Sequence, residues 1–479
     1  MPRRTHTGVP ADHLVKGNGR TFHDPEIARV AAVAAELGAT MRTAVPLSSG
    51  IGAPANGQSP GSLANSPIAA QAAPQAPAKI PFVRASSLAT MQDAQINAMV
   101  AGQPVEVNLQ TNAFLEFLSI DVQIVAVNAA ATVKWNPDGP WAVFGLSGIQ
   151  LTDSANLNLI QPISGFKLAQ LNKFLGDTDC TFDPARDSGF TMLPTAANNA
   201  TGSVATNAGS ANFRLIVPIE IRRRDALGAV TNSAGNEPMR LTLTPVASYA
   251  AGTDKQNNLY ETAPDTSVTV NVQIFQTYWT APPAVIVSGG QSTGTVGTPA
   301  GLGTLGFLRS ELHKEVAGGG DGPFQLTSVG DVISNIIWTL RTTTATNARD
   351  AYTATAGGAI NGGYANWPPV FHFSVNDFTT LSLGQDLWIR EMSKYYDLTN
   401  GISAQAGAPG FLDAGVFTFG PWLDGMFGKA VNFATANQFL ATESGTKLRV
   451  QDNVWGAASA SVAVDVRIIR PNSGAALYA

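Results

Sequence analysis

A strand pattern that occurs twice constrains the fold of this chain more than any other feature of its sequence. In the stretch TSVTVNVQIFQTYW, apolar residues take every second position from Val268 to Ile274. Near the end of the chain, SVAVDVRIIRP repeats this alternation from Val462 to Ile468. A period of two indicates a strand with one buried and one solvent-facing side, and the prolines after each copy end the strand. The recurrence predicts that one type of domain occurs twice.

The chain carries few charges for its length. Of its 479 residues, 44% are hydrophobic and 13% are charged, which is about half of the ~25% charged content of a typical soluble domain. Two explanations are open: the surface is largely covered by other protein subunits, or the protein is a secreted or β-rich one with polar uncharged faces. The net charge of −5 does not favour attraction to nucleic acid, so we expect no specific nucleic-acid partner.

Several classes of protein are disfavoured by what the sequence lacks. Its single cysteine, Cys180, excludes an internal disulfide framework and a cysteine-cluster metal site. No stretch approaches the ~18 uninterrupted apolar residues that a transmembrane helix needs. The N-terminal sequence MPRRTHTGVPADHLVKGNGR has no apolar signal-peptide core, so we expect synthesis in the cytoplasm without export by that route.

The first 80 residues differ in composition from the rest and are predicted to form an N-terminal arm. One helix is expected at about 25–37, where Asp24 suits the N-cap, Pro25 the first helical position and Gly38 the C-terminal cap. An apolar stripe on this helix needs a partner surface, and it consists of Ile27, Val30, Ala34 and Leu37. The Ala/Pro/Gly/Ser-rich stretch after it is predicted to be an extended linker.

The rest of the chain is predicted to be all-β and to form two domains, 81–283 and 284–479. Short alternating runs separated by polar turns are typical of β-sandwiches, and two tandem eight-stranded jelly rolls fit the length. Beyond the two strands above, strands are expected at 105–110, 117–127, 213–223, 239–247, within 324–344, and at 370–375, 416–420, 430–436 and 447–455. Short loop helices are expected at 92–99, at 166–175 and from Leu383 to Tyr395, with a flexible Gly/Ser/Thr-rich connector at 288–304.

No motif in the sequence indicates a catalytic residue, a cofactor or a metal site. Only His313 and His372 lie in the predicted body, too few for the copper ligands of monooxygenases built on tandem jelly rolls. No nucleophile elbow, phosphate loop or dinucleotide fingerprint occurs in a strand-to-helix context. The stretch DTDCTFDPARD, from Asp177 to Asp187, offers oxygen ligands for calcium, but loops more often use aspartate for turn geometry.

Two groups of charged residues leave alternatives open. Arg222, Arg223 and Arg224 are the densest basic run of the body. On a strand they would alternate sides, so we expect contacts with acidic residues of a neighbouring subunit, with a solvated strand end as the alternative. The glutamates of the body leave room for an acidic pair of the glycan-hydrolysing kind, because the sequence does not give their separation; the candidates are Glu220, Glu237 and Glu261.

Four stretches resemble the double jelly-roll major capsid proteins of tectiviruses, which are tailless phages with a membrane inside the capsid. Their first two strands and an Asp-Gly-Pro turn are similar to the stretch FLSIDVQIVAVNAAATVKWNPDGPWAVFGLSGIQL. Their middle strand pair is similar to the stretch FRLIVPIEIRRRDALGAVTNSAGNEPMRLTLTPVA. VQIFQTYWTAPPA, at 272–284, resembles the junction between their jelly rolls, and SVAVDVRIIRP resembles their last strand. The long arm is a departure, because that family begins with a shorter helical arm.

The resemblance implies a structural protein that is not an enzyme. It implies homotrimers whose six jelly rolls form pseudo-hexagonal blocks in an icosahedral shell, so that the protein resides in the virion and is made in the host cytoplasm. The implied partners are neighbouring trimers, minor capsid or vertex proteins, and an internal membrane that the N-terminal arm approaches. Four residues are expected at the crossover between the jelly rolls, where the aromatic rings would lock the two barrels together: Tyr278, Trp279, Pro282 and Pro283.

Two other functions remain open from the sequence. A two-domain β-sandwich that binds carbohydrate or a receptor would present aromatic residues on exposed loops, and Tyr364 and Trp367 are the best candidates. A glycan amidase on tandem jelly rolls would need a convergent acidic pair between the barrels and would be a monomer.

Overall fold

The computed structural model divides the chain into two units, residues 1–76 and 77–479. The structure describes residues 79–470 except for the following: 127–132, 137, 176–190, 193–208, 222, 234–236, 265–266, 284, 289–290, 300–301, 315–323, 327–331, 343–345, 350–351, 354–362, 365–369, 377, 385–386, 388–415, 420–439, 442–445 and 452–459. The predicted arm helix, with Ile27, Val30, Ala34 and Leu37, therefore lies outside the described residues. So do the stretch from Asp177 to Asp187 and the predicted strand at 430–436.

Eight strands between residues 88 and 279 form the first jelly roll. They are β2 (Leu88–Ile96), β3 (Val105–Asn108), β4 (Asn112–Ala126), β6 (Phe144–Thr152), β7 (Asn158–Ile163), β9 (Ala211–Pro218), β11 (Arg240–Pro245) and β13 (Val268–Trp279). One sheet has the order β2-β13-β4-β9 and the other β3-β11-β6-β7, with antiparallel neighbours throughout. Counted along the chain, the strands stand as 1-8-3-6 and 2-7-4-5, which is the double Greek key of a jelly roll.

The second jelly roll repeats this order strand for strand. Its members are β16 (Leu305–Lys314), β17 (Phe324–Leu326), β18 (Val332–Thr342), β21 (Val370–Val375), β22 (Phe378–Gly384), β23 (Val416–Phe419), β25 (Leu448–Gln451) and β26 (Ala460–Arg470). The two sheets are β16-β26-β18-β23 and β17-β25-β21-β22, again 1-8-3-6 and 2-7-4-5. The prediction of two tandem eight-stranded jelly rolls is confirmed, whereas the domain boundaries at 80/81 and 283/284 stay predictions.

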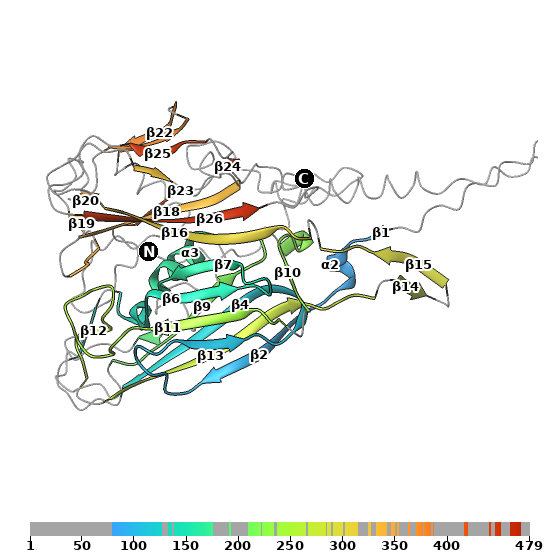
Figure 1. The fold of residues 1–479 in the computed structure, drawn as a ribbon, viewed down its shortest axis with the longest axis horizontal. Helices are drawn as coiled ribbons and strands as arrows, with labels where there is room; N and C mark the ends of the chain where they lie inside the picture. The colour runs from blue at the N-terminus through green and yellow to red at the C-terminus, as the bar shows by residue number, and fades with distance from the viewer. Residues whose placement is uncertain are drawn as a thin grey trace, which may run out of the picture. The chain divides into compact units, whose positions relative to one another are not determined.

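The two jelly rolls share a sheet. Strand β7 of the first pairs in parallel with β16 of the second, with Ile160 opposite Leu308. This contact makes the path β23-β18-β26-β16-β7-β6-β11-β3 continuous across both barrels, and Figure 1 shows β16 beside β7. The fusion is therefore made of backbone hydrogen bonds as well as side-chain packing.

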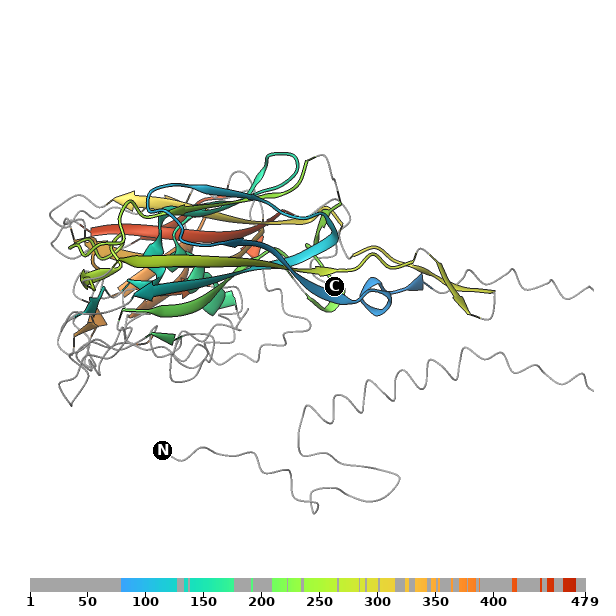
Figure 2. The same cartoon turned by 90° about the horizontal axis from the view of Figure 1, so that it is seen from below.

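Smaller elements extend the sheets or occur in the chain segments before and between the two jelly rolls. Strands β8 (Thr191–Met192) and β10 (Val230–Asn232) lie beside β9 and β4, and β24 (Leu440–Ala441) beside β18. β5 (Lys134–Trp135) pairs with β12 (Tyr260–Thr262), and β19 (Tyr352–Thr353) pairs with β20 (Gly363–Tyr364). In the chain segment that joins the two jelly rolls, β14 (Val285–Ser288) and β15 (Gln291–Val296) form a hairpin whose second strand pairs in parallel with β1 (Lys79–Ile80). Figures 1 and 2 both show this small sheet beyond the ends of the barrel strands.

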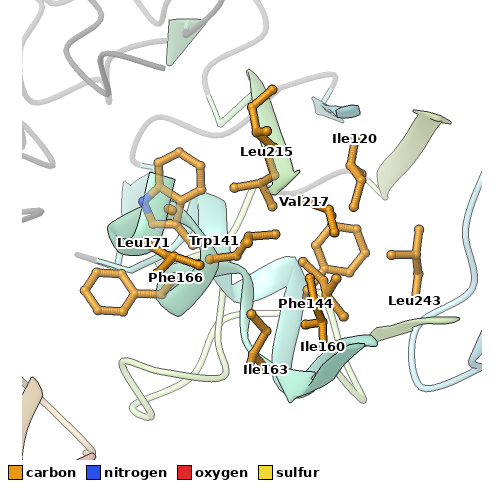
Figure 3. Packing of buried hydrophobic residues seen from close by; sticks show 14 of the residues in the cluster. Ile120, Trp141, Phe144, Ile160, Ile163, Phe166, Leu171, Leu215, Val217 and Leu243 are labelled. Carbon is orange, nitrogen blue, oxygen red and sulfur yellow. The ribbon is translucent and has the colours of Figure 1, made fainter. Parts of the chain in front are cut away.

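The first jelly roll encloses a core of aliphatic and aromatic side chains. The alternation along β13 places Val270, Val272 and Ile274 in this core with no exposed surface. The predicted helix at 166–175 is confirmed as α3 (Gly165–Leu175), and it packs beside the 3-10 helix η3 (Pro140–Val143). Figure 3 shows Trp141 of η3 among side chains from α3 and β9. None of the helices in the described ranges is long and apolar enough to cross a membrane.

Three local predictions are wrong. Residues 92–96, expected in a helix, belong to strand β2, which pairs with β13 at the edge of its sheet. The expected connector at 288–304 contains β15, because pairing with β14 and β1 gives its backbone hydrogen bonds a partner on either side. Strand β22 extends to Gly384, so Leu383 lies in a strand and not at the start of the expected helix; of the remaining helix, only Leu387 is described.

The strands quoted for the family resemblance also occupy a different place in the barrel. The stretch FLSIDVQIVAVNAAATVKWNPDGPWAVFGLSGIQL was compared with the first two strands of the tectivirus fold. It covers most of β4 and β6, which are the third and fourth strands of the first jelly roll. Strands β2 and β3 precede them, so the barrel begins closer to the arm than the comparison implied.

We expect the large-to-small substitution Trp141→Ala to lower the free energy of unfolding by about 3–5 kcal/mol, because it leaves a cavity in a packed core. Trp141 is fully buried, and its ring meets that of Phe213 edge-on at a centroid distance of 4.6 Å. Urea unfolding of the purified chain measures the change. The control is Leu146→Ala on the neighbouring strand β6, where a side chain that is 53% exposed should contribute less than about 0.5 kcal/mol. Equal losses for the two variants would contradict the core described above.

Candidate functional site at the junction of the two jelly rolls

A buried group of three charges joins the first jelly roll to the second. Asp138 lies in the turn before η3, while Arg341 is on β18 and Arg349 follows that strand. Arg341 Nη1 lies 2.7 Å from Asp138 Oδ2, and Arg349 Nε lies 2.8 Å from Asp138 Oδ1. All three side chains are at least 94% buried. One carboxylate of the first barrel thus holds two guanidinium groups of the second.

The electrostatics of this triad favour its charged form. Burial alone would raise the pKa of Asp138, but the charges of Arg341 and Arg349 and their hydrogen bonds outweigh burial and hold the pKa below its ordinary value. Burial lowers the pKa of Arg341, and the neighbouring carboxylate of Asp138 opposes that change. Because an arginine keeps its proton at any ordinary pH, the triad carries one negative and two positive charges.

An aromatic ring compensates for the excess positive charge. The guanidinium carbons of Arg341 and Arg349 lie 5.1 and 4.6 Å from the ring centroid of Phe166, at the start of α3. Cation–π attraction of this kind is strongest where water is excluded. Helix α3, which the sequence predicts, therefore carries the Phe166 ring on which both arginines of the second barrel stack.

A second set of hydrogen bonds lies beside the triad. The backbone N–H of Lys255 donates to the carbonyl of Thr346 at 2.7 Å, and Asn347 Nδ2 donates to Asp254 Oδ2 at 3.0 Å. Arg341 Nη1 donates in turn to the carbonyl of Asn347 at 3.0 Å. The segment after β18 is thereby fixed to a loop of the first jelly roll.

The predicted crossover residues lie away from this junction. Trp279 ends β13, is buried, and donates its indole N–H to Glu220 Oε2 at 2.6 Å. Its ring packs against Phe82 of the short helix α2 (Phe82–Ala85), 6.0 Å between centroids. These partners precede the second jelly roll in the chain. Tyr278 and Pro282 are half-buried and Pro283 is exposed, and the locking role expected for these residues stays a prediction.

The arginine run does not form the strand that was expected. Strand β9 ends at Pro218, and Arg223 and Arg224 belong to the 3-10 helix η5 (Arg223–Asp225). Pro218 supplies no N–H to a ladder, so the strand ends there. Arg223 is 68% exposed and pairs with Glu116 at 3.3 Å, whereas Arg222 and the Arg224 side chain lie outside the described residues. Contact with a neighbouring subunit remains a prediction for all three.

The remaining titratable candidates have separate environments. Glu261 is ion-paired with Lys255, Glu237 is exposed, and Glu220 lies beside Glu116. His372 is half-buried on β21, and the side chain of His313 on β16 lies outside the described residues. Within the described ranges, no group of three or more His, Cys, Asp or Glu residues is placed to hold a metal ion.

Comparison with known proteins gives structural likenesses only. No protein-family model matches the chain, and no curated protein sequence matches it. The chain is similar to double jelly-roll major capsid proteins of viruses. That of Sulfolobus turreted icosahedral virus is 10% identical with a TM-score of 0.45, covering 80% of this chain and 97% of the other. The capsid of PBCV-1 virus is also 10% identical with a TM-score of 0.45, covering 80% and 93%.

Two further likenesses are weaker. The major capsid protein of bacteriophage PM2 is 9% identical, covers 81% of this chain and 100% of its own, and has a TM-score of 0.39. A peptide-N(4)-(N-acetyl-β-D-glucosaminyl)asparagine amidase is 9% identical, covers 81% and 97%, and has a TM-score of 0.28. Likenesses at these values do not assign a function. The double jelly roll is instead established by the strand order of the chain itself.

We expect Asp138→Ala to lower the free energy of unfolding by about 3–5 kcal/mol, because it leaves two arginines buried without their counter-charge. Urea unfolding at neutral pH measures the loss. The matched control is Asp121→Ala, which removes another aspartate held by an arginine, Arg214, but at a partly exposed site. There the loss should not exceed about 1 kcal/mol.

The same pair of variants separates the two sites by pH. The folded pKa of Asp138 is lowered, so its contribution is present above the ordinary aspartate pKa of about 3.9 and is lost as pH falls through the folded value. The difference in stability between the wild-type chain and Asp138→Ala should therefore shrink in acid. A difference that is independent of pH, or no larger than that of Asp121→Ala, would contradict a buried ionic junction.

Proposed function

We propose that this protein is the major capsid protein of a tectivirus-like bacteriophage and assembles as pseudo-hexagonal homotrimers that tile an icosahedral shell. One observation carries the proposal. Two jelly rolls of identical strand order are fused through β7 and β16 and fixed by a buried ionic triad. Three copies of such a pair of similar barrels would place six similar barrels around one axis.

The composition supports an assembled protein. With 13% charged residues, the chain offers few charges that would have to be desolvated when subunits meet, and interface centres are depleted in charged residues. Permanent interfaces commonly bury more than about 2,000 Å². The neighbouring trimers, and minor capsid or vertex proteins beside them, are the partners that this proposal assigns to those surfaces.

We propose no enzymatic activity and no cofactor. The buried carboxylate of Asp138 is committed to two arginines that hold the barrels together. Beside it among the described residues, the carboxylate of Asp254 accepts a hydrogen bond from Asn347 of the second barrel, so both acids serve contacts between the barrels. The carbohydrate- or receptor-binding alternative depends on Tyr364 and Trp367; Tyr364 lies in β20, and Trp367 lies outside the described residues.

The proposal predicts the native mass of the purified full-length protein. Light scattering on a sizing column should give three times the 49.9 kDa of one chain, or larger assemblies built from that unit. Electron microscopy of the larger species should then show a pseudo-hexagonal lattice. A chain that remains monomeric at high concentration would overturn the homotrimer and would favour the carbohydrate-binding or amidase alternative, to be separated by glycan binding and hydrolysis assays.

We also propose that the N-terminal arm approaches an internal membrane, because Arg3, Arg4, Lys16 and Arg20 give its beginning a mild positive charge. Basic segments gain about 1 kcal/mol per charge near an anionic lipid surface. The full-length protein should co-sediment with vesicles that contain phosphatidylserine more than with neutral vesicles, and deletion of residues 1–20 should remove the difference. Equal retention of the deleted protein would overturn membrane contact by this segment while leaving the capsid proposal intact.

A further inference from the structure

Two glutamates, Glu116 and Glu220, lie next to each other in the first jelly roll, close to the segment that precedes its first strand. Glu116 is on β4, and Glu220 follows the end of β9. The backbone N–H of Glu220 donates to the carbonyl of Glu116 at 2.8 Å, which brings these two residues side by side. The Glu116 side chain is 5% exposed. Like charges in such a position repel one another strongly when both are ionised.

The charged side chains described around Glu116 and Glu220 come from η5 and α2, and they differ in sign and in exposure to solvent. Element η5 supplies Arg223, which meets Glu116 Oε1 at 3.3 Å but is 68% exposed, and Asp225, which adds a further negative charge. On α2 the only charged side chain, Arg84, is exposed. From β13 the neutral indole of Trp279 donates to Glu220. Solvent weakens this exposed ion pair, and the side chains of Arg222 and Arg224 lie outside the described residues.

Glu220 therefore changes its charge near neutral pH. Burial is the main cause that raises its pKa, to about 7, and the charge of Glu116 adds to the increase. The hydrogen bond from Trp279 and the charge of Arg223 act in the opposite direction. A glutamate in water has an ordinary value of about 4.3, so exposure of this site would release a proton at pH 6.

The same indole also holds helix α2. Trp279, Phe82, Ala226 and Ala229 form a small apolar cluster of their own. Phe82 lies edge-on to Phe114 at 5.1 Å and to Trp279 at 6.0 Å. Just beyond the helix, the backbone N–H of Ser87 donates to Thr280 Oγ1 at 3.0 Å. Trp279 thus contacts both Glu220 of the carboxylate pair and the segment that precedes the first strand of the barrel.

We propose that Glu116 and Glu220 form a proton-operated latch that attaches the segment 82–87 to the first jelly roll, closed when Glu220 is protonated and loosened when it is ionised. Protonation removes the repulsion between the two carboxylates and leaves Trp279 packed on Phe82. Ionisation favours states in which Glu220 reaches water, and such states separate α2 from the barrel. This inference rests on the fold and not on the proposed capsid function.

The direction with pH follows from linkage. The folded pKa of Glu220 lies above its solvated value, so the closed latch binds the proton more tightly than the open one. Its stability is fully present below about pH 4.3 and is lost as pH rises to about 7. Because one proton is released on opening, the opening equilibrium constant should increase about tenfold per pH unit within this window.

Hydrogen exchange of the full-length chain, followed by mass spectrometry, tests the latch. Peptides that cover 82–88 are measured from pH 5 to pH 8.5, and the known pH dependence of intrinsic exchange is divided out. The wild-type protein should lose protection in this segment as pH rises to about 7. The isosteric variant Glu220→Gln should remain protected across the range, since it cannot ionise. The matched control, Glu237→Gln, replaces an exposed glutamate and should behave as the wild type.

A second variant keeps the proposal falsifiable if Glu220→Gln does not fold. Glu116→Gln removes the neighbouring charge that raises the pKa of Glu220, so the loss of protection should end at a lower pH than in the wild type. Protection in 82–88 that is independent of pH in the wild-type chain would overturn the latch. The same pH dependence in wild type and in either variant of the pair would overturn it as well.

Discussion

The structure depends on one carboxylate that two arginines share across the junction of the barrels. Asp138, Arg341 and Arg349 are buried almost completely, and buried charges are tolerated only when each has its partners in good geometry. The apolar core continues from the first barrel into the second, and the triad with the ring of Phe166 adds directional contacts to it. The pairing of β7 with β16 then adds backbone hydrogen bonds in a single register.

The sequence predicted the strands whose burial is one-sided. Along β13 the alternation follows from one face that meets the core, and both β13 and β26 are strands where the pattern predicts them. Strand β2 was mistaken for a helix because it lies at a sheet edge, where its residues are half-buried or exposed and carry little periodicity. Strands β7 and β16 were not predicted; their partners come from the other barrel as well as their own.

The junction itself had no signal in the sequence. In the sequence, Asp138 is part of an Asp-Gly-Pro turn and Arg341 lies within the strand-rich stretch 324–344, with about two hundred residues between them. Side chains so distant in the chain meet only through the tertiary fold. Trp279 illustrates the intermediate case: its size and polar N–H marked it as an anchor, but the partners that it contacts, Phe82 and Glu220, depend on α2 and on the end of β9.

The described part of the chain buries acidic side chains in two different environments. In the triad, an acid is surrounded by bases that cannot lose their protons at ordinary pH, so the pKa of Asp138 is held low and the junction between the barrels stays charged at neutral pH. Beside Trp279, burial and the charge of Glu116 raise the pKa of Glu220, and Arg223, which pairs with Glu116, is largely in water. The triad therefore keeps its charges near neutral pH, whereas the charge of Glu220 changes with pH in that range. The triad fixes the two barrels relative to each other. The Glu116–Glu220 pair lies beside the segment that connects the first barrel to the arm, where it makes the attachment of that segment adjustable.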